Sequence, residues 1–452
     1  KLLRRVRVEA DWDLEVGAIQ RRVFDGEGPA LLFERVRGYE WPLVSGGLGT
    51  PERYAPAIGC APHLRAIIAR VRDAAEHPIE PVLVGDGVCQ ENVDRGTAID
   101  VRKFPTPKWH RLDGGRYIGT LGLVVTKDPE TGHRNVGIYR EQILGPDRLG
   151  LNATQQVGTL WQKWRRLGRP MPVATVIGLD PCTLAASCVQ ARLGEAEFGI
   201  AGALRGSPLP LVRCVSQDLE APACAEIVLE GEIAPDADLM DEGPFGEFTG
   251  YYGLRTRSPE VRLTAVTYRN RPIFQGTLEG GPPSESTTLR SIGHSAGTWA
   301  KLGRMNLPGV REIYITDMSC ANFMVIVSME KQFYFGHARQ VMEAVWANIH
   351  IAKWVIVVND DIDVFDRRQV EWALATRVQP HRDVWITPQN QPGSNLDPAI
   401  HPDDRNYPNI RTSRIAIDAT YDYKGYEFPP LAKPSEEETA RVMARWREYG
   451  LD

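Results

Sequence analysis

The chain has 452 residues, of which 42% are hydrophobic and 25% are charged, and its formal net charge at pH 7 is -5. This size and composition are typical of a globular protein of two or three domains with enough apolar residues for large cores. The sequence has no basic patch of the kind that binds nucleic acid, and no apolar run approaches the roughly 20 residues that cross a bilayer. We therefore expect neither a nucleic-acid partner nor a membrane span.

Seven cysteines are scattered along the chain, and no two of them form a C-x-x-C pair. This odd, scattered set favours free thiols in a reducing compartment over a disulfide framework or a zinc site. The start of the chain has no apolar segment typical of a signal peptide, and we expect a cytoplasmic protein. Because the chain does not begin with methionine, we also expect part of the native N-terminus to be missing.

The first hundred residues alternate between helix and strand signals. Residues 13–19 predict the start of a capped helix, and residues 63–70 predict an amphipathic helix. Residues 30–34 and 82–84 indicate buried strands. The proline-rich segment 104–108 then forms a joint to the next part of the chain.

Short strands dominate the middle of the chain. Their regular spacing, with glycine and proline turns between them, predicts a barrel or a sandwich. Helical patterns interrupt the strands at 154–167 and 183–191, and a further helix is predicted at 289–303. The predicted strands are 117–125, 134–140, 173–177, 211–217, 224–230, 260–268 and 272–277.

After residue 310 strands and helices alternate, which predicts a separate α/β domain. The predicted strands are 313–315, 325–327 and 354–358, and the predicted helices are 336–350 and 367–376. A charged helical segment follows at 436–449, and we expect it to pack on a neighbouring molecule.

The segment Asp241–Tyr252 (DEGPFGEFTGYY) is the strongest candidate for a reactive site. Glycine and proline hold Glu242 and Glu247 in a loop, and aromatic residues follow at once. A carboxylate pressed against aromatic surface loses water, so its pKa rises and it can carry a proton near neutral pH. The alternative is a solvated turn with two surface glutamates.

A second fragment, Asn135–Arg140 (NVGIYR), predicts a strand. Because side chains alternate across a strand, Asn135 and Arg140 point to opposite faces unless the strand bends at Gly137. Asn135 offers a carbonyl oxygen suited to a divalent cation, and Arg140 offers a planar fork suited to a carboxylate. The ordinary alternative for Arg140 is a surface or salt-bridged arginine.

Glu197 is the one acidic residue in the small, apolar run 197–204. We expect its carboxylate to be nearly buried, where it needs either a salt bridge or a metal ion. A metal would satisfy Glu197 and Asn135 together. Gln155 and Gln156, at the start of a predicted helix, could bond a polar cofactor or could cap and solvate that helix.

Three other motifs carry weaker signals. The run Ser45–Gly49 lacks the first glycine of a dinucleotide-binding fingerprint and has no P-loop lysine. The run Asp360–Asp363 lacks the glycine and the closing glutamate of a calcium loop, which favours helix capping or pairing with basic residues. Cys320 is the cysteine that we consider as a catalytic thiolate.

Several segments resemble the UbiD-type decarboxylases, the family that includes ferulic acid decarboxylase and the ubiquinone-pathway decarboxylase. The resemblance extends from about residue 10 to about residue 430, with long motifs in the same order as in the family. These motifs are 135–140, 197–206, 216–233, 242–252, 336–346 and 355–366.

The resemblance implies an α+β fold. Its N-terminal cofactor domain would combine an α/β part (1–110) with a split β-barrel of the flavin-binding type (111–305). A C-terminal α/β oligomerisation domain (306–430) and a C-terminal helix (431–452) would follow. The family also forms homodimers or homohexamers, and we expect one of these assemblies.

The resemblance implies prenylated FMN as the cofactor, supplied by a flavin prenyltransferase, together with K⁺ and with Mn²⁺ or another divalent metal. By resemblance, Glu247 is the general acid/base that protonates the carbon after CO₂ leaves, while Arg140 and Glu242 orient the carboxylate and hold the charge of the network. Cofactor contacts would fall on Asn135, Ile138, Tyr139, Arg140, Gln155, Gln156, Ser187, Val189, Glu197 and Lys353.

The metal ligands implied by the resemblance are Asn135, Glu197 and Gln156. The family often has a histidine at the third position, and the neutral amide of Gln156 would bind more weakly through its carbonyl oxygen. Substrate contacts would fall on Ile292, His294 and Phe248. His294 could bond a ring N–H or O–H of the substrate or a backbone group of its own chain, and Phe248 could be ordinary core.

The leading hypothesis is a reversible decarboxylase that acts on an aromatic, heteroaromatic or α,β-unsaturated carboxylic acid. A non-catalytic flavin-binding or carrier protein on the same scaffold is the alternative, but a carrier does not need Arg140, Glu242 and Glu247 together. An ordinary flavin reductase would need an NAD(P)H site, and the sequence contains no fingerprint for one.

Overall fold

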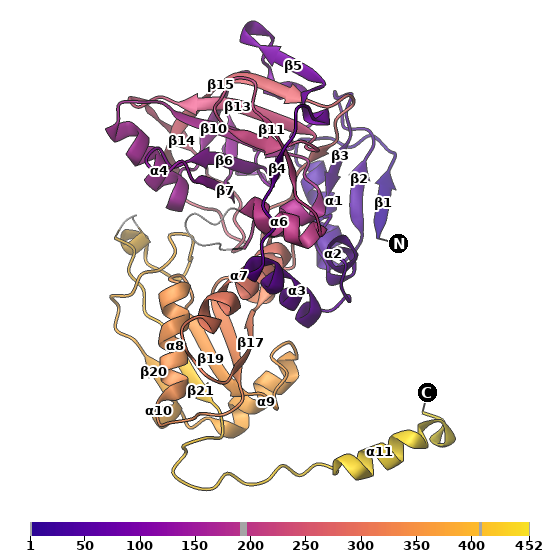
Figure 1. Cartoon of the computed structure of the whole chain (residues 1–452), viewed down its shortest axis with the longest axis vertical. Coiled ribbons are helices and arrows are strands. Elements are labelled where there is room, and N and C mark those ends of the chain that lie inside the picture. Colours follow the sequence, from indigo (N-terminus) through magenta and orange to yellow (C-terminus); the bar gives the residue numbers. More distant parts are fainter. Residues whose placement is uncertain (1, 190–196, 406–408, 452) are drawn as a thin grey trace.

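A computed structural model describes residues 2–189, 197–405 and 409–451 of the chain. The fold is mixed α+β, as predicted, and its strands form four sheets. Figure 1 shows the two larger sheets in separate parts of the molecule, with the helices α3 (Leu64–Glu76) and α7 (Glu285–Gly303) where the two parts meet. The finer prediction of a split flavin-type barrel stays a prediction.

The N-terminal part contains a four-stranded sheet of order β1-β2-β3-β16. The predicted helices at 13–19 and 63–70 and the predicted strand at 30–34 are confirmed, but the predicted cap of the first helix was wrong, since its N-cap residue is Leu14 and no side chain caps it. The elements are β1 (Leu3–Val6), α1 (Glu15–Asp25), β2 (Ala30–Phe33), β3 (Leu43–Ser45), α2 (Pro51–Ile58), α3 and β16 (Phe274–Gln275).

The prediction of a buried strand at 82–84 was wrong about burial. β4 (Val82–Leu83) is the edge strand of a three-stranded sheet with β11 (Pro210–Arg213) and β12 (Glu220–Pro222). Val82 is 45% exposed and Leu83 47% exposed, because nothing in the described chain covers that edge. A short apolar run does not distinguish an edge strand from a central one.

A nine-stranded antiparallel sheet is formed by strands between residues 92 and 268. Its path is β7-β6-β10-β13-β15-β9-β8, and β5 and β14 also pair with β15. Its strands are β5 (Asn92–Arg95), β6 (Leu123–Lys127), β7 (Arg134–Ile138), β8 (Glu141–Ile143), β9 (Arg148–Leu151), β10 (Met171–Ile177), β13 (Ile227–Ile233), β14 (Leu239–Glu242) and β15 (Thr256–Tyr268).

Two predicted elements in this part start or stop elsewhere. The strand predicted at 117–125 begins only at Leu123, and Tyr117 makes a single isolated bridge to Gln142. The helix predicted at 183–191 is α5 (Pro181–Ala186), and residues 190 and 191 lie outside the described residues. The remaining helices here are α4 (Gln155–Arg166) and α6 (Glu197–Arg205).

The C-terminal part is a five-stranded sheet with helices, which confirms the predicted strand and helix alternation. Its order is β17-β18-β19-β21-β20, and β20 and β21 were not predicted. The elements are β17 (Val310–Ile315), β18 (Met324–Met329), α8 (His337–Asn348), β19 (Trp354–Asn359), α9 (Arg367–Arg377), α10 (Pro380–Asp383), β20 (Val384–Ile386) and β21 (Ile415–Ala419).

Helix α7 joins the two parts. A capping box at Ser284 and Thr287 starts it, and it packs on α3 at one side and on β17 at the other. Ile292 and Ala296 of α7 lie in the largest core cluster, which also contains Ile326 and Ile356 of the C-terminal sheet. The apolar core is therefore continuous across the junction.

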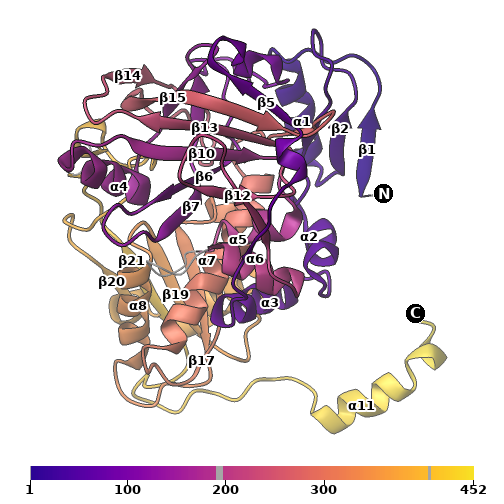
Figure 2. The ribbon, with the colours of Figure 1, turned by 45° about the horizontal axis from the view of Figure 1, so that its top comes forward.

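The last helix, α11 (Glu436–Ala444), has no buried residue. Figures 1 and 2 both show it at the end of an extended segment, away from the rest of the chain. Its neighbourhood exposes large apolar side chains: Val442, Met443, Trp446, Tyr449 and Leu451. Within the described residues, no helix is both long and apolar enough to cross a membrane.

Candidate active site

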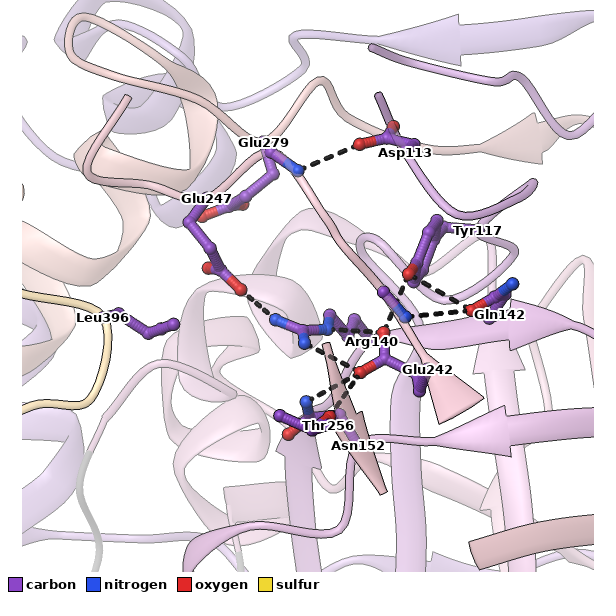
Figure 3. Close-up of polar contacts among 12 residues, drawn as sticks. Asp113, Tyr117, Arg140, Gln142, Asn152, Glu242, Glu247, Thr256, Glu279 and Leu396 are labelled. Atoms are coloured by element: carbon purple, nitrogen blue, oxygen red, sulfur yellow. Dashed lines mark hydrogen bonds and ion pairs between the residues drawn. The ribbon is translucent and has the colours of Figure 1, made fainter. Parts of the chain in front are cut away.

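Glu242, the last residue of β14, is fully buried and is surrounded by donors. Arg140 binds it through two nitrogens, with Nε donating to Oε1 at 2.9 Å and Nη2 donating to Oε2 at 2.8 Å (Figure 3). The Tyr117 hydroxyl donates to Oε1 at 2.8 Å, and the Thr256 hydroxyl and Asn152 amide donate to Oε2 at 3.0 and 3.1 Å. Five donated hydrogen bonds hold this carboxylate in its ionised form.

The pKa of Glu242 is lowered even though the side chain is buried. Burial acts to raise it, but the hydrogen bonds and charge of Arg140, followed by the bonds from Tyr117 and Asn152, outweigh burial. Glu242 is thus a permanent anion that fixes the guanidinium of Arg140.

The loop after Glu242 depends on two glycines. Gly243 has φ 91°, a left-handed backbone that glycine adopts without strain. At Gly246 a Cβ atom would lie 2.2 Å from Cδ2 of His110, so a larger residue cannot fit without moving that ring. Asp113 accepts the Gly246 amide at 2.9 Å and the His110 amide at 2.9 Å, which fixes the loop just before Glu247.

Glu247 shares Arg140 with Glu242 but has a different environment. Its carboxylate accepts from Nη1 of Arg140, and the residue is only 5% exposed. Burial raises its pKa to about 7, and the positive charge of Arg140 opposes burial without overcoming it. The two glutamates therefore bind the same cation, but their pKa values shift in opposite directions. Glu247 can gain or lose a proton near neutral pH. The alternative of a solvated turn is excluded.

Arg140 follows Ile138, the last residue of β7, by two positions. Its side chain is 11% exposed, so the alternative of a surface arginine is excluded. The guanidinium carbon lies 5.3 Å from the centre of the Phe245 ring. The side chain of Asn135 does not contact the two glutamates that Arg140 binds, and its amide instead donates to Gln156 Oε1 at 2.5 Å. This agrees with the prediction that Asn135 and Arg140 point to opposite faces of the strand.

The predicted metal ligands lie close together. The Oδ1 atom of Asn135 is buried and has no hydrogen-bond partner among the described residues. The Glu197 carboxylate accepts from the backbone amide of Val136, next to Asn135, and burial raises the pKa of Glu197 to about 8. An orphaned carbonyl oxygen beside a buried carboxylate fits a hard cation such as Mn²⁺ or Mg²⁺.

Of the three predicted metal ligands, only Glu197 can carry a negative charge. No group of three His, Cys, Asp or Glu side chains suited to a metal occurs in the part of the chain that the structure describes. Any metal at this place must therefore take oxygen ligands from the amides of Asn135 and Gln156 together with Glu197. Gln156 is exposed, so its side chain can turn toward an ion.

The other predicted cofactor residues lie on several elements. Ile138 and Tyr139 are at the end of β7, and the Tyr139 phenol lies near Glu197 and the Val157 amide. Ser187 and Val189 follow α5, where the Ser187 hydroxyl donates to the Leu184 carbonyl at 2.7 Å. The side chain of Gln155 lies outside the described part of the structure. Cofactor binding by these residues stays a prediction.

Lys353 and the predicted substrate residues lie toward the C-terminal part. The Lys353 ammonium pairs with Asp397 at 2.9 Å. His294 bonds the Ala321 carbonyl through Nδ1 at 3.2 Å, and burial lowers its pKa to about 4, so the ring is neutral at pH 7. Ile292 is fully buried. The centres of the Phe248 and Phe323 rings are 6.2 Å apart.

The weaker motifs have structural roles. In the 45–49 loop, the Gly46 and Leu48 amides donate to the buried carboxylate of Glu285 at 2.9 and 2.7 Å, which leaves them no role in phosphate binding. Asp361 pairs with Arg377 at 2.7 Å, as the alternative reading of that motif predicts. Burial raises the pKa of the Cys320 thiol, which disfavours a reactive thiolate.

Sequence reasoning missed most of the groups that surround the two glutamates. Tyr117 was taken as part of a strand, although it lies in a loop that turns its hydroxyl toward Glu242. The residues missed are Asp113, Tyr117, Asn152, Thr256, Glu279 and Arg290. They come from loops, the start of strand β15 and the start of helix α7, far apart in the sequence, and no local pattern links them.

The chain is similar to known proteins over most of its length. Models of the N-terminal, Rift-related and C-terminal domains of 3-octaprenyl-4-hydroxybenzoate carboxy-lyase match residues 1–71, 82–282 and 287–419. The UbiD-class enzyme HmfF from Pelotomaculum thermopropionicum, solved with FMN, is 35% identical over 96% of this chain and 95% of its own, with a TM-score of 0.84. An evolved dimeric form of HmfF was solved with prenylated FMN (prFMN).

Two further solved structures are similar. Vanillic acid decarboxylase from Sedimentibacter hydroxybenzoicus, in a closed form, is 29% identical over 100% of this chain and 96% of its own, with a TM-score of 0.90. The 3,4-dihydroxybenzoic acid decarboxylase AroY from Klebsiella pneumoniae is 27% identical over 97% and 96%, with a TM-score of 0.81.

The opposite pKa shifts predict opposite stability effects. Glu242→Gln weakens the partner of a buried arginine and should lower the free energy of unfolding by about 3 kcal/mol at pH 7. The folded protein holds a proton on Glu247 up to about pH 7, whereas the unfolded chain releases it near pH 4.5, so the stability of the native protein falls between these values. Glu247→Gln should therefore raise the free energy of unfolding by up to about 3 kcal/mol at pH 8 and by little at pH 4.5.

Urea unfolding of both variants at pH 4.5, 7 and 8 measures these effects. Asp241→Asn, whose native side chain is 72% exposed, is the matched control and should leave stability unchanged. Equal destabilisation by both glutamine variants at pH 8 would contradict the assignment.

Proposed function

Because the chain belongs to the UbiD family of carboxy-lyases, we propose that it catalyses the reversible, non-oxidative decarboxylation of an aromatic, heteroaromatic or α,β-unsaturated carboxylic acid. The observation that supports this reaction is the opposed state of two glutamates on one arginine. A proton must reach the carbon that loses CO₂, and Glu247 is the group whose pKa suits that transfer.

The proposed cofactor is prenylated FMN, supplied by a flavin prenyltransferase. FMN and prFMN are bound in HmfF, which is 35% identical to this chain. When bound, the cofactor supplies an electron sink for the negative charge left on an sp² carbon, which the protein alone cannot stabilise. Its proposed contacts are the predicted residues on β7 and after α5, together with Lys353. Lys353 would exchange its ion pair with Asp397 for a contact with the phosphate of the cofactor.

In this proposal, each member of the network has one task. Glu242 stays ionised and keeps the Arg140 guanidinium in place through two hydrogen bonds. The N–H groups of Arg140 that are not directed at the glutamates orient the substrate carboxylate. Glu247 holds the proton and delivers it to the carbon, and in the carboxylation direction it takes the proton back.

We propose that Asn135, Gln156 and Glu197 hold the divalent metal. The orphaned Oδ1 of Asn135 and the buried Glu197 carboxylate support this site. With one anionic ligand, the site should bind a divalent ion more weakly than a site with two. The implied K⁺ stays a prediction without assigned ligands.

The substrate is proposed to lie against Phe248, Ile292 and His294. Because Nδ1 of His294 bonds the Ala321 carbonyl, the neutral ring presents Nε2 as an acceptor for a ring N–H or O–H. The vanillic acid and 3,4-dihydroxybenzoic acid decarboxylases act on phenolic acids, which agrees with a substrate of this kind.

The alternative, a non-catalytic flavin-binding or carrier protein, is not favoured. A carrier gains nothing from burying a carboxylate with a raised pKa, and this burial costs stability. A carrier also has no use for a cation shared between that carboxylate and Glu242.

We further propose that the chain assembles as a homodimer or homohexamer and that residues 431–451 take part. The apolar side chains on and after α11 are exposed in the single chain, so a second copy would bury them.

The reaction is tested with wild-type protein produced together with a flavin prenyltransferase and screened for CO₂ release from acrylic, phenolic and heteroaromatic acids. Glu247→Gln should keep the absorbance of the bound cofactor and lower CO₂ release by about 100-fold or more. Asp241→Asn should behave as wild type. Turnover that survives in Glu247→Gln would refute the acid/base assignment, and a wild-type protein without prFMN would refute the cofactor.

The metal site is tested by titrating Mn²⁺ into FMN-loaded protein and following its electron paramagnetic resonance signal. Gln156→Glu adds an anionic ligand of the same shape and should tighten Mn²⁺ binding by about tenfold. Asn135→Leu removes a carbonyl ligand and should weaken binding. Unchanged affinity in both variants would place the metal elsewhere.

The role of the tail is tested by light scattering on the full chain and on a chain that stops after residue 430. Truncation should lower the mass of the assembly, because it removes the apolar side chains that a second copy would cover. Glu437→Gln, on the exposed α11, should keep the native mass. An unchanged mass after truncation would exclude the tail from the interface.

A further inference from the structure

A second buried ion pair lies beside the catalytic network. Arg290, in the second turn of α7, donates through Nη1 to Oε1 of Glu279 at 2.8 Å. The Ser286 hydroxyl donates to the same carboxylate oxygen at 2.8 Å. Glu279 is 4% exposed and the Arg290 side chain 26% exposed, so water reaches the pair only in part and salt screens it less than an exposed pair.

The surrounding structure fixes both partners close to Glu247. The guanidinium carbon of Arg290 lies 4.8 Å from the ring centre of Phe248, the residue after Glu247. His110 bonds the Glu279 carbonyl at 2.6 Å, and Arg21 donates to the Gly281 and Pro283 carbonyls at 2.7 Å each. Figure 3 shows Glu279 beside Glu247, and each member of the pair acts on the charge of Glu247.

We propose that the Glu279–Arg290 pair is a positioning element that balances charge around Glu247 and so sets the proton affinity of the acid/base. The use of that proton in decarboxylation rests on the proposed function. The electrostatic effect on Glu247 rests only on the arrangement of charges.

The charged groups that face Glu247 form two opposite pairs. Arg140 and Glu242 are one pair, and Arg290 and Glu279 are the other. The neighbour of Glu247 from the C-terminal part is the apolar Leu396 (Figure 3). The Cδ2 atom of Leu396 and the side chain of Glu247 both lie within about 3.5 Å of the position that a Cβ atom on Gly253 would take. Each cation has an anion beside it, so Glu279 and Glu242 oppose the effects of Arg140 and Arg290 on Glu247, and burial has the largest influence on its protonation.

Breaking the second pair should upset this balance in a defined direction. Arg290 without Glu279 would favour the ionised form of Glu247, which would then lose its proton below neutral pH. Glu279 without Arg290 would favour the protonated form and keep the proton at alkaline pH. If the Glu279–Arg290 pair only stabilised the fold, its two variants would not shift the pKa of Glu247 in opposite directions. An apolar pair of similar volume can replace a buried ion pair without loss of stability.

The test measures Glu247 directly, by NMR of the full chain labelled with ¹³C at the glutamate side-chain carboxyl. The Glu247 signal is assigned by its loss in Glu247→Gln. Glu279→Gln should lower the pKa of Glu247 by about 1, and Arg290→Gln should raise it by about 1. The double variant should return to within about 0.3 of wild type, and Arg290→Lys, which keeps the charge, should match wild type.

Each glutamine can still hydrogen-bond the remaining partner, which favours folding of the single variants. If one of them does not fold, the other must still shift in its stated direction and the double variant must reverse that shift. Shifts of the same sign, no shift, or a double variant no closer to wild type than the singles would overturn the proposal.

The outcome is separable from the proposed function. The titration uses neither substrate nor cofactor, so an inactive protein that shows the opposite shifts supports the charge balance and counts against decarboxylation. An active enzyme whose variants leave the pKa of Glu247 unchanged supports decarboxylation and counts against the charge balance. In an active enzyme, the pH at which kcat/KM falls to half should move with the NMR value in each variant.

Discussion

One buried guanidinium faces two buried carboxylates, and a single cation cannot neutralise both. Arg140 binds Glu242 through Nε and Nη2 and Glu247 through Nη1, and all three side chains are nearly inaccessible to water. If both carboxylates were ionised, a net negative charge would remain in a medium of low dielectric, which is costly. One of them must therefore take up a proton near neutral pH, and the surrounding residues determine that it is Glu247.

The nine-stranded sheet supplies this asymmetry. Arg140, Asn152 and Thr256 come from three of its strand ends or turns, and Tyr117 reaches in from the loop before β6, so four different segments converge on Glu242. Glu247 lies one tight loop further along the chain and receives, among the described residues, only the Arg140 bond. Two glutamates five residues apart thus have pKa values shifted in opposite directions, that of Glu242 lowered and that of Glu247 raised to about 7.

The sequence allowed prediction of the groups that are chemically unusual in their local context. Glu242 and Glu247, either side of a Gly-Pro turn, are buried, and the side chain of Arg140 is 11% exposed. Glu197, the lone glutamate in an apolar run, is only half-buried by exposed area, but loss of water raises its pKa to about 8. The donors to Glu242 other than Arg140 could not be predicted, because Tyr117 and Thr256 are ordinary residues until the sheet brings them together. The exposure of Val82 and Leu83 and the late start of β6 also depend on pairing between distant strands, which local periodicity does not encode.

The ionic environment of Glu247 also determines how it should respond to a substrate. With its own carboxyl group protonated, the site contains two cations and two anions, so it is neutral. In the proposed reaction, a substrate carboxylate that enters beside Arg140 would add a negative charge, which would raise the pKa of Glu247 further and keep the proton in place while the substrate binds. In the proposed reaction CO₂ leaves as a neutral molecule and the negative charge stays on the carbon that lost it. That carbon then becomes the stronger base and would take the proton of Glu247. In this proposal, the balance that buries a carboxylic acid at neutral pH keeps the proton on Glu247 until the carbon becomes basic enough to accept it.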